Sequence, residues 1–501
     1  MVVALIYFAV LLFLIYKTSF FGIIKDNDIS AKIFTLLFFL KALAIPVFYF
    51  IYQRFYGGIE NFDSGNFYRN AKTVNEFART NFLEYLKMMF GLQDDNEGSY
   101  VYNTCLIYTN NWDNGQIRDF FYNDNRIVIR IHSLIHFIAF NSYFVHALFN
   151  CFLSFIGIVY LYKALKPFFV NKYIWVLLIL CFFPTLWFYT GAVLKEGLTL
   201  FFLGCGIYQL NKIALKEYKF SSILFLIFSI FMAFLLKPYV LLFSFMCFAL
   251  FFKIYYSKKI NNKLLVYFTI ILIGILGTNV ASLLIKNKSL YTVAMARQRV
   301  FADASTGGIF LKDSKKFIRL NYDTTLVKKV LKMPNVYTIK LNAAFIYCEL
   351  SHLQDTLVCY ANKDTITQYD LDFKIAKSGS NFKLPNSFLK LSLYSFYYTL
   401  AHPLFFNARN SLQFVASLEN VIIILSLLIF LIGLIGSKKD KFIPVAMVTV
   451  AFFVCYLIGI TTPNSGAIVR YRSLVVIFIL LSALYYLPNL KKVIKVFFQK
   501  N

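Results

Sequence analysis

Long apolar runs dominate this sequence and limit the folds open to it. Hydrophobic residues make up 59% of the chain and charged residues only 15%, whereas a soluble domain is about half apolar and about a quarter charged. The excess falls in runs close to the ~20 residues that cross a bilayer as a helix. We therefore predict an all-α polytopic membrane protein with about eleven transmembrane helices. The predicted spans are 2–16, 33–52, 131–161, 173–190, 197–210, 221–236, 239–252, 264–285, 417–436, 443–460 and 473–487.

Short basic loops alternate along this series of spans. Lysines cluster after the first, third, fifth, seventh, ninth and eleventh predicted spans. Because cytoplasmic loops carry the excess of Lys and Arg, the N-terminus is predicted outside and the C-terminus in the cytoplasm. The same loops account for the net charge of +27, and no nucleic-acid-binding pattern is present. The first run has no basic n-region and no small-residue cleavage site, which predicts a retained helix rather than a signal peptide.

The spans and loops divide the chain into three predicted parts. These are 1–285, with spans one to eight and an outer loop at 53–130; 286–416, an extracytoplasmic insert with an interfacial helix; and 417–501, with the last three spans.

The insert differs in pattern from the rest of the chain. Residues 336–350 and 355–361 alternate as strands do, which predicts a small outward-facing β-containing insert. Residues 387–405 are aromatic and amphipathic and predict an interfacial helix. Cys348 and Cys359 share the insert and can pair if it faces an oxidising space.

Asp63 is the first candidate for chemistry. It follows the second span in the segment FDSGNFYRNA. A carboxylate just outside the bilayer suits a general base that acts on an acceptor hydroxyl. The alternative is a helix cap, because Asp-Ser-Gly before a helical stretch is good N-cap chemistry.

Lys195 and Glu196 lie in a tight outer turn between two close spans. Charges there are costly unless they are paired or functional. Lys195 is a candidate for phosphate contact and Glu196 for orienting an acceptor or a metal. The alternative is a pair that only reaches towards the membrane interface.

Arg470 and Arg472 lie at the outer mouth of the last span. Arginine is the side chain best suited to bidentate phosphate contact, and it is unusual in a short outward-facing loop. Two residues at i and i+2 do not share a helix face, so both reach one diphosphate only from an extended or turn segment.

Arg297 and Arg299 are candidates for a second anion site, against the alternative of a solvated loop surface. His132 and His136 are spaced i, i+4 but lack a third ligand, so no metal site is predicted.

A resemblance emerges from these positions. The order Asp63, Tyr68, Ala71 is similar to the first outer loop of GT-C-type membrane glycosyltransferases, in which an Asp is the usual catalytic base. Pro184 followed by Glu196 at the next outer turn is also similar to that class. This chain departs from the class in having two spans before the acidic loop and no tandem carboxylate pair.

The last candidate motif carries a second resemblance. The order Asn464-x-Gly466-x-x-x-Arg470-Tyr471-Arg472 resembles the end of several bacterial cell-envelope polysaccharide membrane proteins.

The resemblances imply a multi-pass glycosyltransferase of a bacterial inner membrane. It moves a sugar from a polyprenyl-phosphate-linked donor to a glycan or lipid acceptor on the outer face. Asp63 is then the base, and Arg470, Arg472 and Lys195 hold the phosphate, with Tyr68, Glu196, Arg297 and Arg299 as further substrate contacts. Such a donor carries its own activation, so no organic cofactor is expected, and a divalent metal ion is left open.

Two other functions remain open at this point. An O-antigen polymerase or ligase depends on outward arginines and a large late loop, and needs Asp63 less. A non-enzymatic lipid-linked glycan flippase or an envelope-assembly subunit is the third hypothesis. Transporters usually carry internal repeats, and none is found here.

Overall fold

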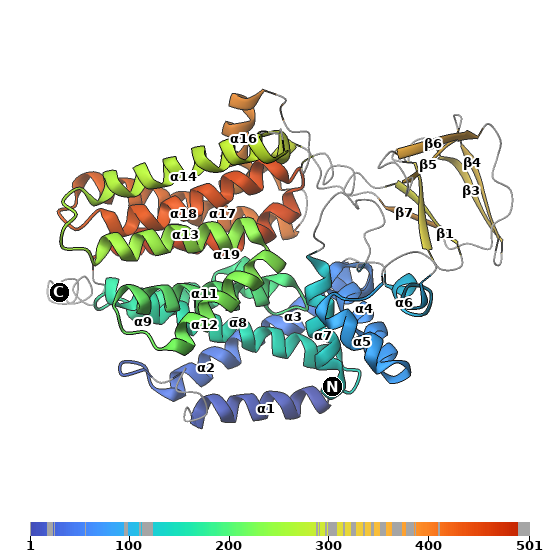
Figure 1. Ribbon diagram of the computed structural model, residues 1–501, viewed down its shortest axis with the longest axis horizontal. Helices are drawn as coiled ribbons and strands as arrows, with labels where there is room; N and C mark the ends of the chain where they lie inside the picture. The colour runs from blue at the N-terminus through green and yellow to red at the C-terminus, as the bar shows by residue number, and fades with distance from the viewer. Residues whose placement is uncertain are drawn as a thin grey trace. The chain divides into compact units, whose positions relative to one another are not determined.

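The computed structural model (Figure 1) is largely helical, with a few short strands. It describes residues 2–17, 24, 26–55, 57–94, 99–109, 112, 124–286, 289, 291–295, 298, 385, 387–408 and 411–488, together with the backbone of seven strands between 308 and 376. Two compact units form. The first comprises Met1–Gly65, Ala139–Met295 and Leu384–Asn501, and the second comprises Asn66–Ile138 and Ala296–Lys383.

The first unit is a bundle of apolar helices. Its helices are α1 (Val2–Lys17), α2 (Ala31–Ala42), α3 (Ala44–Phe55), α8 (Tyr143–Leu165), α9 (Tyr173–Phe182), α10 (Pro184–Thr190), α11 (Lys195–Ala214), α12 (Phe220–Leu235), α13 (Pro238–Tyr255), α14 (Lys263–Lys286), α16 (Phe388–Leu400), α17 (Ser411–Gly436), α18 (Phe442–Thr461) and α19 (Ser465–Tyr486). Short 3₁₀ turns lie at Ile59–Asn61, Lys166–Phe168 and Phe405–Asn407.

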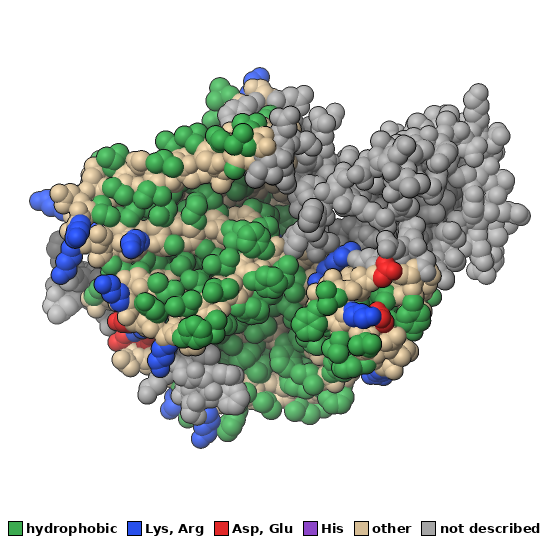
Figure 2. Space-filling view, in the orientation of Figure 1, with side chains coloured by type: hydrophobic (Ala, Val, Ile, Leu, Met, Phe, Trp, Pro, Cys, Tyr) green, Lys and Arg blue, Asp and Glu red, His purple; other side chains and the backbone are tan. Residues whose placement is uncertain are grey.

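The described helices identify a multi-pass membrane protein. Seven of them are long and apolar enough to cross a bilayer, and the pair α9 and α10, bent by 56° at Pro184, makes an eighth if it is one span. The shorter apolar helices are α1 and α12. Figure 2 shows apolar side chains over the broad face of α13 and α14, and α14 exposes Leu265, Ile273 and Leu284. An apolar surface of this extent suits lipid rather than water.

One predicted span is wrong in its bounds. Residues 131–161 are not a single helix, because the backbone adopts positive φ at Phe140 and Asn141 (50° and 55°). Non-glycine residues rarely adopt this conformation, and helices do not continue through it. The segment therefore divides into α7 (Asn125–Ala139), which carries Arg126 and Arg130, and the apolar α8.

Helices α8 and α11 form the most closely packed pair of the bundle. A Cβ atom on Gly204 would lie 1.9 Å from the carbonyl oxygen of Gly157, and one on Gly157 would lie 2.4 Å from the carbonyl oxygen of Leu200. Small residues at helix contacts let backbones approach closely, and the resulting van der Waals packing is one of the forces that associate helices in lipid. This contact fixes the position of α11 along α8, and so the position of the first residues of α11.

Two of the basic loops meet at one end of the bundle. Lys172, which precedes α9, donates a hydrogen bond to the carbonyl of Leu484 (2.7 Å). Lys439, between α17 and α18, donates to the carbonyl of Tyr485 (2.9 Å). Both lysines thus reach the C-terminal end of α19, whose first residue, Ser465, lies at the opposite end of the helix.

The second unit contains short helices and the strands. The helices are α4 (Asp63–Thr80, which begins in the first unit), α5 (Phe82–Phe90), α6 (Tyr100–Thr104), a 3₁₀ turn at Leu106–Tyr108, and α7. Asn81 separates α4 from α5 by accepting a hydrogen bond from the Glu84 N–H (3.1 Å), as an N-cap does. Ser133 of α7 binds both α4 and α5, since its carbonyl accepts from Asn75 of α4 (2.9 Å) and its hydroxyl bonds the hydroxyl of Tyr85 in α5 (3.2 Å).

The strands pair as short antiparallel ladders. They are β1 (Gly308–Asp313), β2 (Lys316–Asn321), β3 (Val327–Met333), β4 (Val336–Leu341), β5 (Phe345–Leu350), β6 (Leu357–Asn362) and β7 (Phe373–Ala376). One sheet has the order β2-β1-β7, and β3 pairs with β4 and β5 with β6. The backbone register places Cys348 directly opposite Cys359. The predicted outward-facing placement of this insert stays a prediction.

Candidate functional site

Asp63 begins the helix that follows the second predicted span. It is the first residue of α4, where the helix dipole stabilises a carboxylate. The helix start is fixed by Gly65, because a Cβ there would lie 2.3 Å from the carbonyl oxygen of Ile59. The Asp63 side chain is 57% exposed, and its Oδ2 accepts a hydrogen bond from Nη1 of Arg470 (2.8 Å).

Arg470 connects Asp63 to a buried carboxylate. Its Nε lies 2.9 Å from Oε1 of Glu196, an ion-pair contact in which the N–H is not directed along a hydrogen bond. The Arg470 side chain is 14% exposed and that of Glu196 is wholly buried. Glu196 Oε1 also accepts from Lys237 Nζ (2.6 Å).

Lys237 completes the arrangement. It precedes α13 and is nearly buried, and its ammonium lies 4.0 Å from the ring centre of Tyr471. Such a cation–π contact partly replaces the lost hydration of the ammonium. We call these four residues the charged cluster: Asp63, Glu196, Lys237 and Arg470. Their charges alternate in sign along the contacts, from the exposed Asp63 through Arg470 and Glu196 to the buried Lys237.

The two halves of the charged cluster differ in strength. An exposed ion pair such as Asp63–Arg470 contributes about 0–1 kcal/mol. Removing one partner of a buried pair such as Glu196–Lys237 costs about 3–5 kcal/mol. Burial alone would raise the pKa of the Glu196 carboxyl, but the positive charges of Arg470 and Lys237 outweigh it and hold that pKa well below its usual range. Glu196 is therefore an anion that fixes the two cations.

Ser64 anchors the start of α4 next to the charged cluster. Its buried hydroxyl accepts a hydrogen bond from the Val193 N–H (3.1 Å) and shares another with the Tyr143 hydroxyl (2.7 Å). Val193 lies in the turn that leads into α11, so Ser64 ties the residue after Asp63 to the segment before Glu196. The side-chain amide of Asn150 in α8 holds the same turn by donating to the carbonyls of Ala192 and Leu194.

Arg472 points elsewhere, contrary to the expectation that both arginines reach one diphosphate. Asn464 caps α19 by accepting from the Ala467 N–H (2.9 Å), so the expected extended or turn segment is helical. Residues i and i+2 of a helix do not face the same way. The fully buried Arg472 donates to the Thr399 carbonyl and to the side-chain oxygen of Asn420.

A buried carboxylate accompanies Arg472. Glu419 Oε1 lies 3.7 Å from Arg472 Nη2, and Glu419 also accepts from the N–H (3.0 Å) and hydroxyl (2.8 Å) of Thr185. Thr185 follows Pro184 at the bend between α9 and α10. Arg472, Glu419 and Thr185 therefore connect α19, α17 and α10.

The remaining candidates are distributed more widely. Lys195 is the first residue of α11 and is mostly buried, and its charge acts on Lys237. Tyr68 lies in the second unit, where its ring contacts that of His136 (5.0 Å between ring centroids). Arg297 and Arg299 lie outside the described residues.

Lys237 is the member of the charged cluster that sequence reasoning missed, because a lysine in an outer turn is expected to reach towards the membrane interface. The signal that was present is its position before Pro238, which fixes it as the residue preceding a helix. Its partner, Glu196, is 41 residues away in the chain, so no local sequence pattern indicates the pair.

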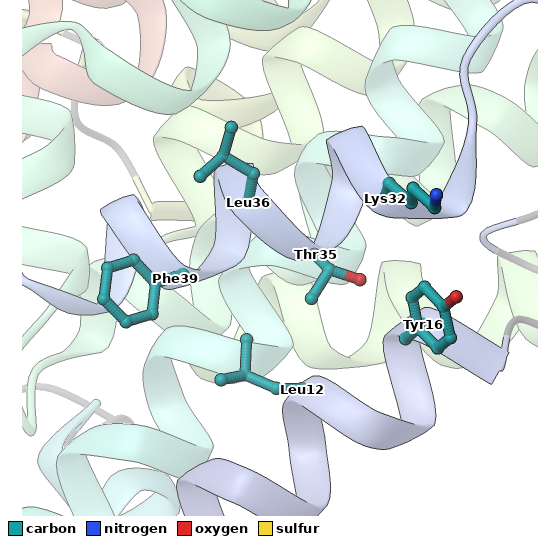
Figure 3. Close-up of a pocket in the computed structure, with 6 residues that line it drawn as sticks. All are labelled: Leu12, Tyr16, Lys32, Thr35, Leu36 and Phe39. Carbon is teal, nitrogen blue, oxygen red and sulfur yellow. The ribbon is translucent and has the colours of Figure 1, made fainter.

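The described part of the chain offers little for a second site. No group of three or more His, Cys, Asp or Glu side chains there is arranged to hold a metal ion. Figure 3 shows a groove between α1 and α2 lined by Leu12, Tyr16, Lys32, Thr35, Leu36 and Phe39. It shares no residue with the charged cluster, and its mostly apolar lining offers little to a reacting group.

Comparison of the chain with protein-family models, with curated protein sequences and with solved structures found no match in any of the three.

Proposed function

We propose that the protein is a membrane glycosyltransferase that moves a sugar from a polyprenyl-phosphate-linked donor to an acceptor on the extracytoplasmic face. The observation that carries this proposal is the 2.8 Å contact between the exposed carboxylate of Asp63 and the guanidinium of Arg470. A general base and a phosphate-binding cation are the two groups that this reaction needs side by side.

The proposed orientation follows from the two ends of α19. Lys172 and Lys439 contact its C-terminal end, and Arg470 lies in its second turn from the other end. Since basic loops stay in the cytoplasm, the charged cluster belongs at the outer boundary, with about eleven spans, the N-terminus outside and the C-terminus inside. We place the protein in a bacterial inner membrane on the basis of the resemblance to cell-envelope enzymes.

In the proposed reaction, the acceptor hydroxyl gives its proton to the Asp63 carboxylate as its oxygen attacks the anomeric carbon of the sugar. The bond between that carbon and the phosphate oxygen breaks, and its electron pair leaves on the phosphate. Arg470 stabilises that developing charge because Glu196 holds its guanidinium in place before the reaction begins. The nearby Lys195 adds positive charge.

A polysaccharide polymerase or ligase is the second candidate. The observation that favours it is that Arg470 has a buried, fixed partner, whereas Asp63 is exposed and held by one ion pair. This difference is expected of an enzyme in which Arg470 is needed for the reaction and Asp63 is not.

Complementation in cells separates the two candidates. Asp63→Asn and Arg470→Ala are compared for surface glycans at equal protein abundance. Loss of glycan with Asp63→Asn supports the glycosyltransferase with a carboxylate base. Full activity of Asp63→Asn with loss in Arg470→Ala rejects that base and favours the polymerase or ligase. Normal glycans in both variants would reject both the glycosyltransferase and the polymerase or ligase.

A further inference from the structure

Arg470 has two carboxylate partners in very different surroundings. Glu196 is fully buried and is held in addition by Lys237, whereas Asp63 is 57% exposed. The two contacts also use different nitrogen atoms, Nε for Glu196 and Nη1 for Asp63. A competing anion can therefore reach the Asp63 side of the guanidinium without disturbing the Glu196 side.

We propose that Asp63 and the phosphate of the lipid-linked ligand compete for Nη1 of Arg470, so that phosphate binding releases the Asp63 carboxylate. This inference rests on the proposed function and adds an order of events to it. Without ligand, Oδ2 of Asp63 accepts the hydrogen bond from Arg470 Nη1, so this oxygen is occupied when the acceptor hydroxyl arrives. With the phosphate on Arg470, the carboxylate is free to accept the proton of the acceptor hydroxyl.

The surroundings of the charged cluster favour this exchange. Arginine binds phosphate oxygens in the same geometry as carboxylate oxygens, so one anion replaces the other without moving the guanidinium. Ser64, held by Val193 and Tyr143, keeps the backbone beside Asp63 in place while the side chain changes partner. The exchange needs only a rotation of the exposed Asp63 side chain.

The test measures binding of farnesyl phosphate, a short prenyl monophosphate, to the purified full-length protein in detergent, with farnesol as the uncharged control. Asp63→Asn removes the competing carboxylate and is expected to tighten binding by about two- to fivefold, the range that an exposed ion pair provides. Asp63→Glu keeps a competing carboxylate and is expected to stay near the wild-type affinity.

Loss of a nearby negative charge can also tighten anion binding, and two variants separate that effect. Glu60→Gln removes an exposed carboxylate from the 3₁₀ turn just before α4 and is expected to leave binding unchanged. In an Arg470→Gln background, Asp63→Asn is expected to have no effect. Equal tightening by Asp63→Asn and Glu60→Gln would overturn the exchange, whether or not Arg470→Gln folds.

The outcomes also separate this inference from the proposed function. Wild-type binding that Asp63→Asn does not alter would reject the exchange and leave the glycosyltransferase proposal standing. No binding of farnesyl phosphate to either the wild type or Asp63→Asn would reject the phosphate site itself, and the proposed function with it.

Discussion

Nε of Arg470 lies 2.9 Å from Oε1 of Glu196, in a pair that brings the second turn of α19 against the first turn of α11. The same carboxylate oxygen binds Lys237, so one buried anion orients two cations that come from separate helices. This arrangement makes Glu196 the structural centre of the charged cluster and Asp63 its exposed, exchangeable member.

Glu196→Gln is expected to destabilise the protein by about 3–5 kcal/mol, because it leaves two buried cations without their anion. The apparent melting temperature in detergent measures the effect. Glu76→Gln is the matched control, since Glu76 is 56% exposed and forms only a surface pair with Lys72. Its expected cost is at most about 1 kcal/mol. Equal melting temperatures for the two variants would contradict the central role of Glu196.

Arg472→Ala is expected to lower stability and cellular abundance rather than phosphate affinity. It leaves Glu419 buried without its cation, at a cost of about 3–5 kcal/mol. Abundance and melting temperature are compared with those of Arg79→Ala, which removes an exposed arginine from the last turn of α4. A well-folded Arg472→Ala protein that no longer binds farnesyl phosphate would instead show that Arg472 belongs to the phosphate site.

Binding of a prenyl phosphate is expected to weaken as the pH rises through about 8. Burial lowers the pKa of Lys237 to about 8, with the charge of Glu196 opposing that change, so Lys237 is protonated at neutral pH and loses its charge above this value. The charged cluster then carries one excess negative charge and repels the phosphate.

The stability contribution of Lys237 has the opposite pH dependence. Its pKa in an unfolded chain is about 10.4, so between pH 8 and about 10.4 the unfolded state binds more protons. Stability from this residue therefore rises with pH across that window. Lys237→Arg stays charged and is expected to remove both trends, as titrations of binding and melting temperature will show. Unchanged trends in this variant would assign them to another group.

Gly204→Ala is expected to destabilise the bundle by about 1–3 kcal/mol, the usual cost of overpacking. The new methyl group would meet the carbonyl of Gly157 at 1.9 Å, and backbone cannot move aside as a side chain can. Gly274→Ala in α14 is the control, because no atom lies within 4 Å of a Cβ placed there. Thermal unfolding of the two variants compares them, and similar melting temperatures would mean that α8 and α11 do not pack this closely.

Much of the candidate site could be predicted from residue type and position. Asp63 is a candidate because a carboxylate just outside the bilayer suits a general base. Glu196 is a candidate because charges between two close spans are costly unless they are paired or functional. Arg470 is a candidate because arginine suits phosphate contact and is unusual in a short outward-facing loop. The structure brings these three together. Arg472 is a candidate on the same grounds as Arg470, but its role could not be predicted, since that depends on whether the segment after Asn464 is extended or helical.

The sequence by itself determined that this is a multi-pass membrane protein, because a run of apolar residues carries its own preference for lipid wherever it lies in the chain. Only the tertiary structure decided which charges face one another. Lys237 pairs with Glu196, and Arg472 with Glu419, through the packing of helices that are distant in sequence. Such ion pairs depend on the positions of whole helices, so they leave no periodic pattern for sequence analysis to detect.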